Sequence, residues 1–292
     1  MTMHIGHVAL RVLDIDRAAE LQQQALGLRE AWRDENEIRL TAGHKSHELQ
    51  LLRSPVSGLD HIGLEVEGEE ELQAVYDRAL AAGAEAVDDF PREEGLGRAV
   101  RFIGPADIVY EVYDGMARAP LAPDEFKGRG ARRLGHLGFI AEHQQEILAF
   151  WIDVLGFRIS DEIPGEETWT RCDFDHHGLG AALGESGDVL HHVAWEVQDL
   201  PALAQLCDEL PQYDLALSWG PVRHGPGYNI STYMLDTEGS MIEVYTDLLR
   251  IFDESKYVPV DWSNTPRAQN LWGPPLNDEV MNAGIPLLRP ES

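Results

Sequence analysis

The apolar and polar positions of this 292-residue chain follow one order four times: an alternating segment, a segment with helical spacing, and then further short alternating segments. Alternation with a period of two is typical of half-buried strands, whereas apolar residues spaced three and four apart indicate amphipathic helices. Each repeat therefore predicts a βαβββ unit. Because internal repeats determine architecture, the four units predict an α+β protein built from two similar domains with two units each.

The predicted elements lie at corresponding places in the four units. We expect the leading strands at residues 4–13, 61–66, 134–140 and 192–197. A helix follows each of them, and Gly27, Gly83 and Gly156 mark three of the helix ends, since glycine is favoured just beyond the last turn. The remaining strand signals lie at residues 38–42, 48–52, 98–103, 108–113, 168–174, 180–183, 231–235 and 241–245.

Changes in composition predict the domain boundaries. Residues 117–133 carry prolines and charges, separate the two halves, and are predicted to be a linker. We therefore expect an N-terminal domain at residues 1–118 and a C-terminal domain at residues 131–250. Residues 251–292 fall outside the repeats and carry six prolines but also two tryptophans. These apolar anchors indicate an ordered arm, and the sequence leaves open whether it covers a site.

The composition is that of a soluble globular protein, with 43% hydrophobic and 25% charged residues. No apolar run reaches the length of about 18 residues that a membrane helix needs. The N-terminus lacks the basic and apolar regions of a secretory signal, and Cys172 and Cys207 are too few for a disulfide scaffold. We therefore expect a cytoplasmic protein that is not embedded in a membrane.

The chain is strongly acidic, with 51 acidic residues against 23 basic ones and a formal net charge of −28. Such a field repels polyphosphates and anionic membrane surfaces, so we expect neither a nucleic acid nor a membrane as a partner. Two interpretations of the charge remain open: solubility, including at high salt, and attraction of a cationic ligand.

Histidine and glutamate recur at matching positions in the two halves. These positions are His7, His61 and Glu111 in the first half and His136, His192 and Glu243 in the second. Two imidazoles and one carboxylate leave open positions on a six-coordinate ion, which suits Fe(II) in oxygen chemistry and which Mn(II) also accepts. Strand alternation places His191 and His192 on opposite faces, and alignment with His136 selects His192 as the inward donor. His191 is then expected at the surface or behind the donors.

The second half also carries a longer pattern across residues 220–225 and 233–243. In these segments the chain resembles the type I extradiol ring-cleaving dioxygenases, which are catechol 2,3-dioxygenase-like members of the vicinal oxygen chelate superfamily. The resemblance covers roughly residues 4–250. It implies a glyoxalase/bleomycin-resistance/extradiol dioxygenase-like fold, in which each domain is a curved mixed sheet around a cavity. Thr237 departs from the family, which usually has proline at this turn.

The resemblance implies one complete active site, in the C-terminal domain. The positions that correspond to the iron ligands of the family are His136, His192 and Glu243. His177 would be the acid–base residue, while His224 and Tyr233 would bind the substrate hydroxylates. These residue types suit the chemistry, because a metal lowers the pKa of a bound hydroxyl and a neutral histidine can accept a proton and return it.

The first half retains a donor triad but lacks its partners. Arg101 stands ten residues before Glu111, where the second half has a tyrosine, and Arg92 stands where it has a histidine. His47 matches His177 only loosely, one residue out of register. We therefore interpret the first triad as a remnant in a non-catalytic domain, and the sequence leaves open whether it binds a metal.

The predicted function is Fe(II)-dependent extradiol (meta) cleavage of a catecholic substrate by dioxygen, in the catabolism of aromatic compounds. By resemblance we expect a homo-oligomer. Two alternatives within the superfamily remain open: a glyoxalase-like metal-dependent isomerase or epimerase, and a non-catalytic module that binds a small molecule. The ring substituents of the substrate are not predicted, although Phe174, Trp195 and Trp272 are candidates for shaping the pocket.

Overall fold

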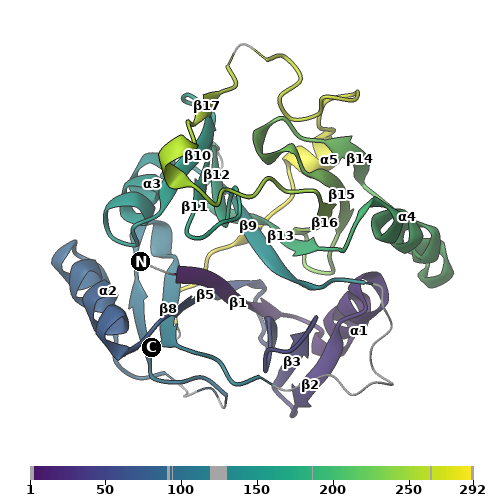
Figure 1. Cartoon of the computed structure of the whole chain (residues 1–292). Helices are drawn as coiled ribbons and strands as arrows, with labels where there is room; N and C mark the ends of the chain where they lie inside the picture. Colours follow the sequence, from purple (N-terminus) through teal and green to yellow (C-terminus); the bar gives the residue numbers. More distant parts are fainter. Residues whose placement is uncertain are drawn as a thin grey trace.

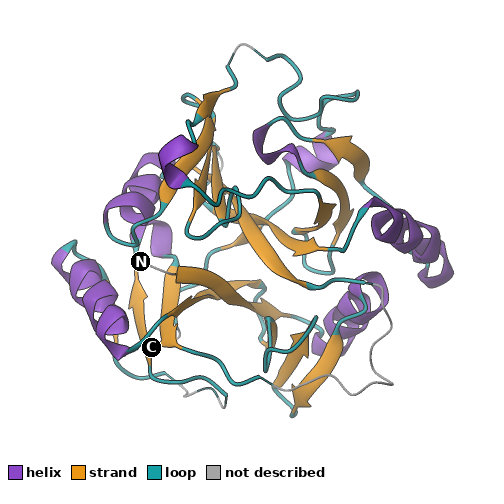
Figure 2. Ribbon diagram, viewed as in Figure 1, coloured by secondary structure: helices purple, strands orange, loops and turns teal. Residues whose placement is uncertain are grey.

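The chain folds into two mixed β-sheets with helices on their outer sides (Figures 1 and 2). The structure is a computed structural model, and it describes residues 3–90, 93, 95–118, 130–185, 187–263 and 265–290. The predicted α+β class and the four βαβββ units are confirmed. Most of the predicted linker lies outside the described residues. No helix in the described part of the chain is long and apolar enough to span a membrane.

The N-terminal sheet has eight strands in the order β2-β3-β4-β1-β5-β8-β7-β6. Its strands are β1 (Met3–Val12), β2 (Arg29–Arg33), β3 (Glu37–Thr41), β4 (Leu49–Arg53), β5 (Gly58–Val66), β6 (Glu85–Val87), β7 (Ala99–Ile103) and β8 (Val109–Asp114). The two units of this half meet where β1 and β5 pair in antiparallel fashion.

The C-terminal sheet repeats this arrangement in the order β14-β15-β16-β13-β9-β12-β11-β10-β17, and β18 pairs with β13. Its strands are β9 (Arg133–Ala141), β10 (Arg158–Ile163), β11 (Glu167–Arg171), β12 (Leu179–Leu183), β13 (Val189–Glu196), β14 (Trp219–Arg223), β15 (Ile230–Leu235), β16 (Met241–Thr246), β17 (Val260–Asp261) and β18 (Ile285–Pro286). The antiparallel pair β9 and β13 joins its two units.

One helix follows the leading strand of each unit. The helices are α1 (Ile15–Leu26), α2 (Glu69–Ala81), α3 (Gln144–Asp153) and α4 (Leu200–Glu209), and the short α5 (Asp278–Met281) follows later. Helix α1 begins and ends as expected: the Asp14 carboxylate accepts a hydrogen bond from the Arg17 amide, and Gly27 adopts φ 70° at the C-terminal end.

The strands that follow each helix directly were not assigned from the sequence. These are β2, β6, β10 and β14, and each lies near or at the margin of its sheet. Strand β2 is mostly exposed, and β6 has only three residues, so neither shows the alternation of a half-buried strand. They supply the third strand that the βαβββ unit requires.

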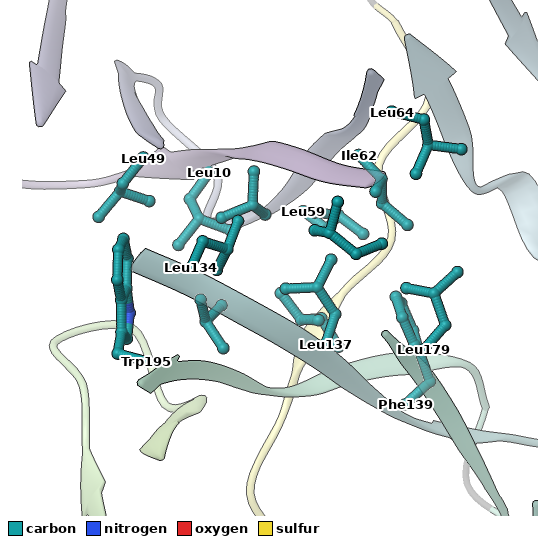
Figure 3. Close-up of a cluster of buried hydrophobic side chains, with 14 of the residues drawn as sticks. Leu10, Leu49, Leu59, Ile62, Leu64, Leu134, Leu137, Phe139, Leu179 and Trp195 are labelled. Carbon is teal, nitrogen blue, oxygen red and sulfur yellow. The ribbon is translucent and has the colours of Figure 1, made fainter. Parts of the chain in front are cut away.

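The two sheets pack against each other through one shared hydrophobic core. On β1, Val8 and Leu10 face this core, and on β9 Leu137 and Phe139 do so; Figure 3 shows leucines of both halves meeting there. Because strand side chains alternate, the residues between them face the hollow side of each sheet. This alternation is what directs His7 and His136 away from the core.

A buried hydrogen bond joins the two halves. The Trp151 indole of α3 donates from Nε1 to the Tyr110 hydroxyl of β8 at 2.8 Å, and both side chains are fully buried. Tyr110→Phe would leave the indole N–H without an acceptor, so we expect the free energy of unfolding to fall by about 1–3 kcal/mol. Urea denaturation measures this change. Tyr76→Phe, in the same aromatic cluster, is the matched control and should shift stability by less than about 0.5 kcal/mol.

Residues 251–290 form an arm that contacts both sheets. Strand β17 pairs with β10, β18 pairs with β13, and Leu287 forms a bridge with Leu59 of β5. The Trp262 ring packs in a small apolar cluster with Trp169 of β11. The arm therefore crosses the open side of the C-terminal sheet before it reaches the N-terminal half (Figure 1).

Candidate functional site

Three adjacent strands bring His136, His192 and Glu243 together. Ala194 of β13 pairs with His136 of β9 on one side and with Glu243 of β16 on the other. The Glu243 Oε2 atom lies 3.1 Å from His136 Nε2 and 3.3 Å from His192 Nε2. A Cβ atom at position 138 would lie 1.9 Å from His192 Cε1, so Gly138 provides the space for this ring. The three side chains could hold one metal ion.

Hydrogen bonds hold one carboxylate oxygen of Glu243, and the other oxygen faces the two histidines. Ser231 Oγ and Asn229 Nδ2 donate to Oε1 at 2.6 and 3.1 Å. Burial would raise the pKa of the Glu243 carboxyl, but His136 and His192 outweigh this effect and hold the pKa well below its usual range. Glu243 is therefore ionised at neutral pH, and its Oε2 atom is an anionic donor.

The tautomer of His192 is set from outside the triad. His191 Nε2 lies 2.7 Å from the Val280 carbonyl oxygen, which can only accept, so this nitrogen carries the proton. In the neutral ring His191 Nδ1 is then an acceptor, and His192 Nδ1 donates to it at 2.7 Å. This leaves the lone pair of His192 Nε2 facing Glu243. Burial lowers the pKa of both imidazoles, which keeps them neutral.

The donor set therefore fits a divalent cation: two imidazoles and one carboxylate converge without a proton between His192 and Glu243. His191 lies behind His192, which is one of its two expected positions, but the prediction that the two rings lie on opposite faces of β13 was wrong. The register of β13 shifts between Leu190 and His192, so strict alternation fails there, and both histidines line the same cavity.

His177 lies beside the triad, in the loop before β12. Its ring centroid is 4.3 Å from that of His136. Burial, followed by the neighbouring His136 and His176, lowers the pKa of His177 well below its ordinary value, so the imidazole is neutral at pH 7. His177 Nδ1 is 3.0 Å from His176 Nδ1, and His176 Nε2 is 3.2 Å from the Asp161 carboxylate.

Tyr233 and His224 form a hydrogen-bonded pair, and the Tyr233 ring lies beside that of His192. His224 Nδ1 donates to the Gln269 carbonyl oxygen at 2.7 Å, so Nε2 of the neutral ring is an acceptor. The Tyr233 hydroxyl donates to that atom at 2.8 Å. Burial lowers the pKa of His224 and raises that of Tyr233, which keeps both groups uncharged. The phenolic oxygen retains lone pairs that can accept from a ligand hydroxyl.

All six residues line one cavity of about 800 Å³. The arm contributes part of its wall, including Gln269, Leu276 and Val280, which answers the question of coverage that the sequence left open. The residues proposed to shape the pocket lie elsewhere. Trp195 is buried in the core between the sheets (Figure 3), and Phe174 and Trp272 are largely exposed. The tryptophans that line the cavity are Trp169 and Trp219.

Several contributors escaped the sequence analysis. They are Asp161, His176, Asn229, Ser231, Gln269 and the Val280 carbonyl. Asn229 and Ser231 precede Tyr233 in one segment, so proximity along the chain was an available signal. The arm residues act through backbone carbonyls, which no side-chain motif reports.

The first half brings its own histidines and glutamates together. His7, His61 and Glu111 are close enough to hold a metal, and Glu93 joins them. The register of His47 needs correction. Leu49 of β4 pairs with Val8 of β1, just as Leu179 of β12 pairs with Leu137 of β9. His47 and His177 each lie two residues before these leucines, so they occupy the same position. Arg101 is the cross-strand neighbour of Glu111, and Tyr233 is the cross-strand neighbour of Glu243, so Arg101 occupies the position of Tyr233. Arg92 lies outside the described residues.

Comparisons with known proteins find relatives along most of the chain. The model of the Glyoxalase/Bleomycin resistance protein/Dioxygenase superfamily matches residues 4–112 and 133–244. A metapyrocatechase of Pseudomonas sp. (strain CF600) is 26% identical over 280 residues, with 89% of this chain and 90% of the relative covered. An iron-dependent extradiol dioxygenase of Rhodococcus jostii is 26% identical over 233 residues, with 72% and 76% covered.

Solved structures share the fold. Homoprotocatechuate 2,3-dioxygenase from Arthrobacter globiformis has a TM-score of 0.89 at 22% identity, with 97% of this chain and 92% of that chain covered. A Mn(II)-bound glyoxalase from Novosphingobium aromaticivorans has a TM-score of 0.84 at 24% identity, with 100% and 95% covered. At these identities the likeness concerns architecture alone.

Proposed function

Since the chain belongs to the Glyoxalase/Bleomycin resistance protein/Dioxygenase superfamily and is similar over most of its length to extradiol ring-cleaving enzymes, we propose that it is an extradiol dioxygenase. It opens the ring of a catechol beside its two hydroxyls, with Fe(II) and dioxygen, in the catabolism of aromatic compounds. The observation that carries this proposal is one cavity that contains the donor triad together with His177, His224 and Tyr233.

The residues that would bind the metal are His136, His192 and Glu243. When bound, Fe(II) supplies Lewis acidity, which lowers the pKa of the catechol hydroxyls, and redox chemistry with dioxygen. Mn(II) accepts the same donors. Either ion requires a neutral imidazole at His192 and an ionised carboxylate at Glu243, and the surroundings favour both states.

Tyr233 and His224 orient the substrate. Because the Tyr233 hydroxyl donates to His224, its oxygen accepts a hydrogen bond from a catechol hydroxyl. The Gln269 carbonyl fixes the ring of His224 in this orientation. The pair therefore holds the substrate oxygen at one place in the cavity.

His177 is the acid–base residue. Its neutral imidazole accepts a proton from the substrate at the start of turnover and returns it later. The contact with His176 occupies Nδ1, so Nε2 is the atom that exchanges the proton. The His177 side chain is only 4% exposed and lines the cavity, so it can reach a bound substrate.

The charge of the cavity indicates the substrate class. Glu166, Glu167 and Glu185 line it, and its described lining contains no lysine or arginine. Burial raises the pKa of Glu167 to about 7, so this carboxyl is charged in part at neutral pH. An anionic ring substituent would lack a cationic partner there, which disfavours it. The preferred substrates are therefore catechols with uncharged alkyl or aryl substituents.

Oxygen uptake by iron-loaded protein tests both points. We expect uptake and a yellow product with catechol, 3-methylcatechol and biphenyl-2,3-diol. The kcat/KM for the anionic 3,4-dihydroxyphenylacetate should be at least ~10-fold lower, equivalent to about 1.4 kcal/mol in the transition state. Absence of uptake with every catechol would refute the dioxygenase proposal. Equal kcat/KM values for charged and uncharged catechols would refute only the argument from cavity charge.

The alternatives within the superfamily are an isomerase or epimerase and a binding module. The fold is shared with a Mn(II)-bound glyoxalase and does not separate them. The pairing of Tyr233 with His224 and the presence of His177 beside the triad favour the dioxygenase, because an isomerase of the glyoxalase type has no need for this set. A binding module would also not need three metal donors.

A further inference from the structure

A second cluster of metal-binding residue types is buried in the N-terminal half. Its members are His7 on β1, His61 on β5, Glu111 on β8 and Glu93 in the loop before β7. Each is at most 7% exposed. From the sequence, His7, His61 and Glu111 were interpreted as the remnant of a metal site. Glu93 is a fourth member that the repeat did not reveal, since it lies outside the strand pattern.

The hydrogen bonds around the cluster direct its lone pairs inward. His61 Nδ1 lies 2.7 Å from the Asp60 carboxylate and donates to it, which leaves His61 Nε2 as an acceptor. His7 Nε2 is 3.1 Å from that atom and 3.4 Å from Glu111 Oε2. A carboxylate behind a histidine in this way is the usual support of a metal ligand.

Arg101 neutralises part of the negative charge of Glu93 and Glu111, but it donates to only one oxygen of each carboxylate. It donates from Nε to Glu111 Oε1 at 2.8 Å and from Nη2 to Glu93 Oε1 at 2.9 Å, and Nη2 also lies 3.4 Å from His61 Nε2. Both Oε2 atoms are buried and make no hydrogen bond of good geometry with a described residue, although His47 Nε2 lies 3.0 Å from Glu93 Oε2. The C-terminal site has the same design, because Ser231 and Asn229 bind Oε1 of its glutamate and leave Oε2 for the metal.

Two carboxylate oxygens and two imidazole nitrogens therefore face one another in one buried cluster. Buried acceptors without a partner are costly, and a cation between them removes this cost. A tetrahedral site with bonds of about 2.0–2.1 Å places its donors about 3.3–3.4 Å apart. The pairs His7–His61, His7–Glu111 and His61–Glu111 measure 3.1, 3.4 and 3.7 Å. Glu93 is farther, 4.0 Å from His7.

We propose that the N-terminal half binds a second divalent transition-metal cation, of which Zn²⁺ fits best, through His7, His61, Glu93 and Glu111. Four protein donors close the coordination sphere, which is typical of structural rather than catalytic zinc. Arg101 stands where the C-terminal half has Tyr233, so a substrate-binding hydroxyl is missing. The ion ties β1, β5 and β8 to the loop that carries Glu93.

The first test uses the Glu243→Gln protein, in which the N-terminal half is unchanged. After incubation with excess Zn²⁺ and desalting, elemental analysis should find about one equivalent of zinc per chain. Co²⁺ added in place of Zn²⁺ should give the visible absorption of a four-coordinate ion. Retention of no metal would overturn the proposal.

The second test adds Glu93→Gln or Glu111→Gln to Glu243→Gln. Glutamine keeps a carbonyl oxygen for Arg101, so the fold is preserved while the anionic donor is lost. We expect each double variant to retain less than a tenth of the zinc that Glu243→Gln retains. Equal retention would show adventitious binding and overturn the proposal. In the Glu111→Gln single variant, oxygen uptake should continue, which separates this result from any failure of the proposed dioxygenase function.

Discussion

Glu243→Gln is expected to remove one equivalent of metal from the protein and nearly all of its oxygen uptake with catechol. The carboxylate provides the only anionic donor of the C-terminal triad, and it lies within 3.3 Å of both histidine nitrogens. Glutamine can keep the hydrogen bonds from Ser231 and Asn229 but carries no charge. Because the metal contributes several kcal/mol to the reaction, we expect turnover to fall by at least about 10³-fold.

Elemental analysis and an oxygen electrode measure the two effects on the same sample. Glu238→Gln is the matched control, since this residue lies in the turn before β16 and does not line the cavity. It should retain both metal and activity. If Glu243→Gln kept wild-type metal content and turnover, the assignment of the triad would be wrong.

His177→Ala separates proton transfer from metal binding. The His177 ring contacts His136 but is not one of the three donors, so the variant should retain its metal. We expect kcat to fall by about 10²–10⁴-fold, which is the usual contribution of a positioned acid–base group. The KM for catechol should change far less, because Tyr233 and His224 still hold the substrate.

Steady-state oxygen uptake with parallel metal analysis distinguishes these outcomes. His143→Ala controls for the loss of an imidazole, since His143 is half-exposed and hydrogen-bonded to Asp188, outside the cavity. Unchanged turnover in His177→Ala would remove this residue from the mechanism. Loss of metal together with activity would instead assign it a structural role.

The sequence predicted the parts of the molecule that repeat. The donor triad was found because three residues recur at matching positions, and their strands follow from the alternation of apolar residues. His191 lies behind the donors as expected, but it was assigned to the opposite face of the strand because a β-bulge interrupts that alternation, and a bulge has no reliable signal in a single sequence. His47 appeared out of register because the connection between β4 and β5 is one residue shorter than the one between β12 and β13. Strand pairing aligns His47 with His177.

The pattern of apolar and polar residues could not predict β2, Glu93 or the contacts of the arm. Strand β2 is largely exposed and carries no apolar face, so only its place beside β3 defines it. Glu93 lies in a loop, and nothing along the chain links it to His7 or His61. The contacts of the arm with His191 and His224 depend on backbone carbonyls far away in the sequence, which only the folded chain brings into reach.

The arm touches the site in two chemically different ways. Its carbonyl oxygens at Val280 and Gln269 orient His191 and His224, and its side chains form part of the cavity wall. A carbonyl oxygen is the same whichever side chain its residue carries. Mutations at positions such as Leu276 and Met281 can therefore remodel the wall while the histidines keep their orientation. The fold thus separates an evolvable surface, on which new aromatic substrates can be selected, from a chemical centre that selection does not need to rebuild.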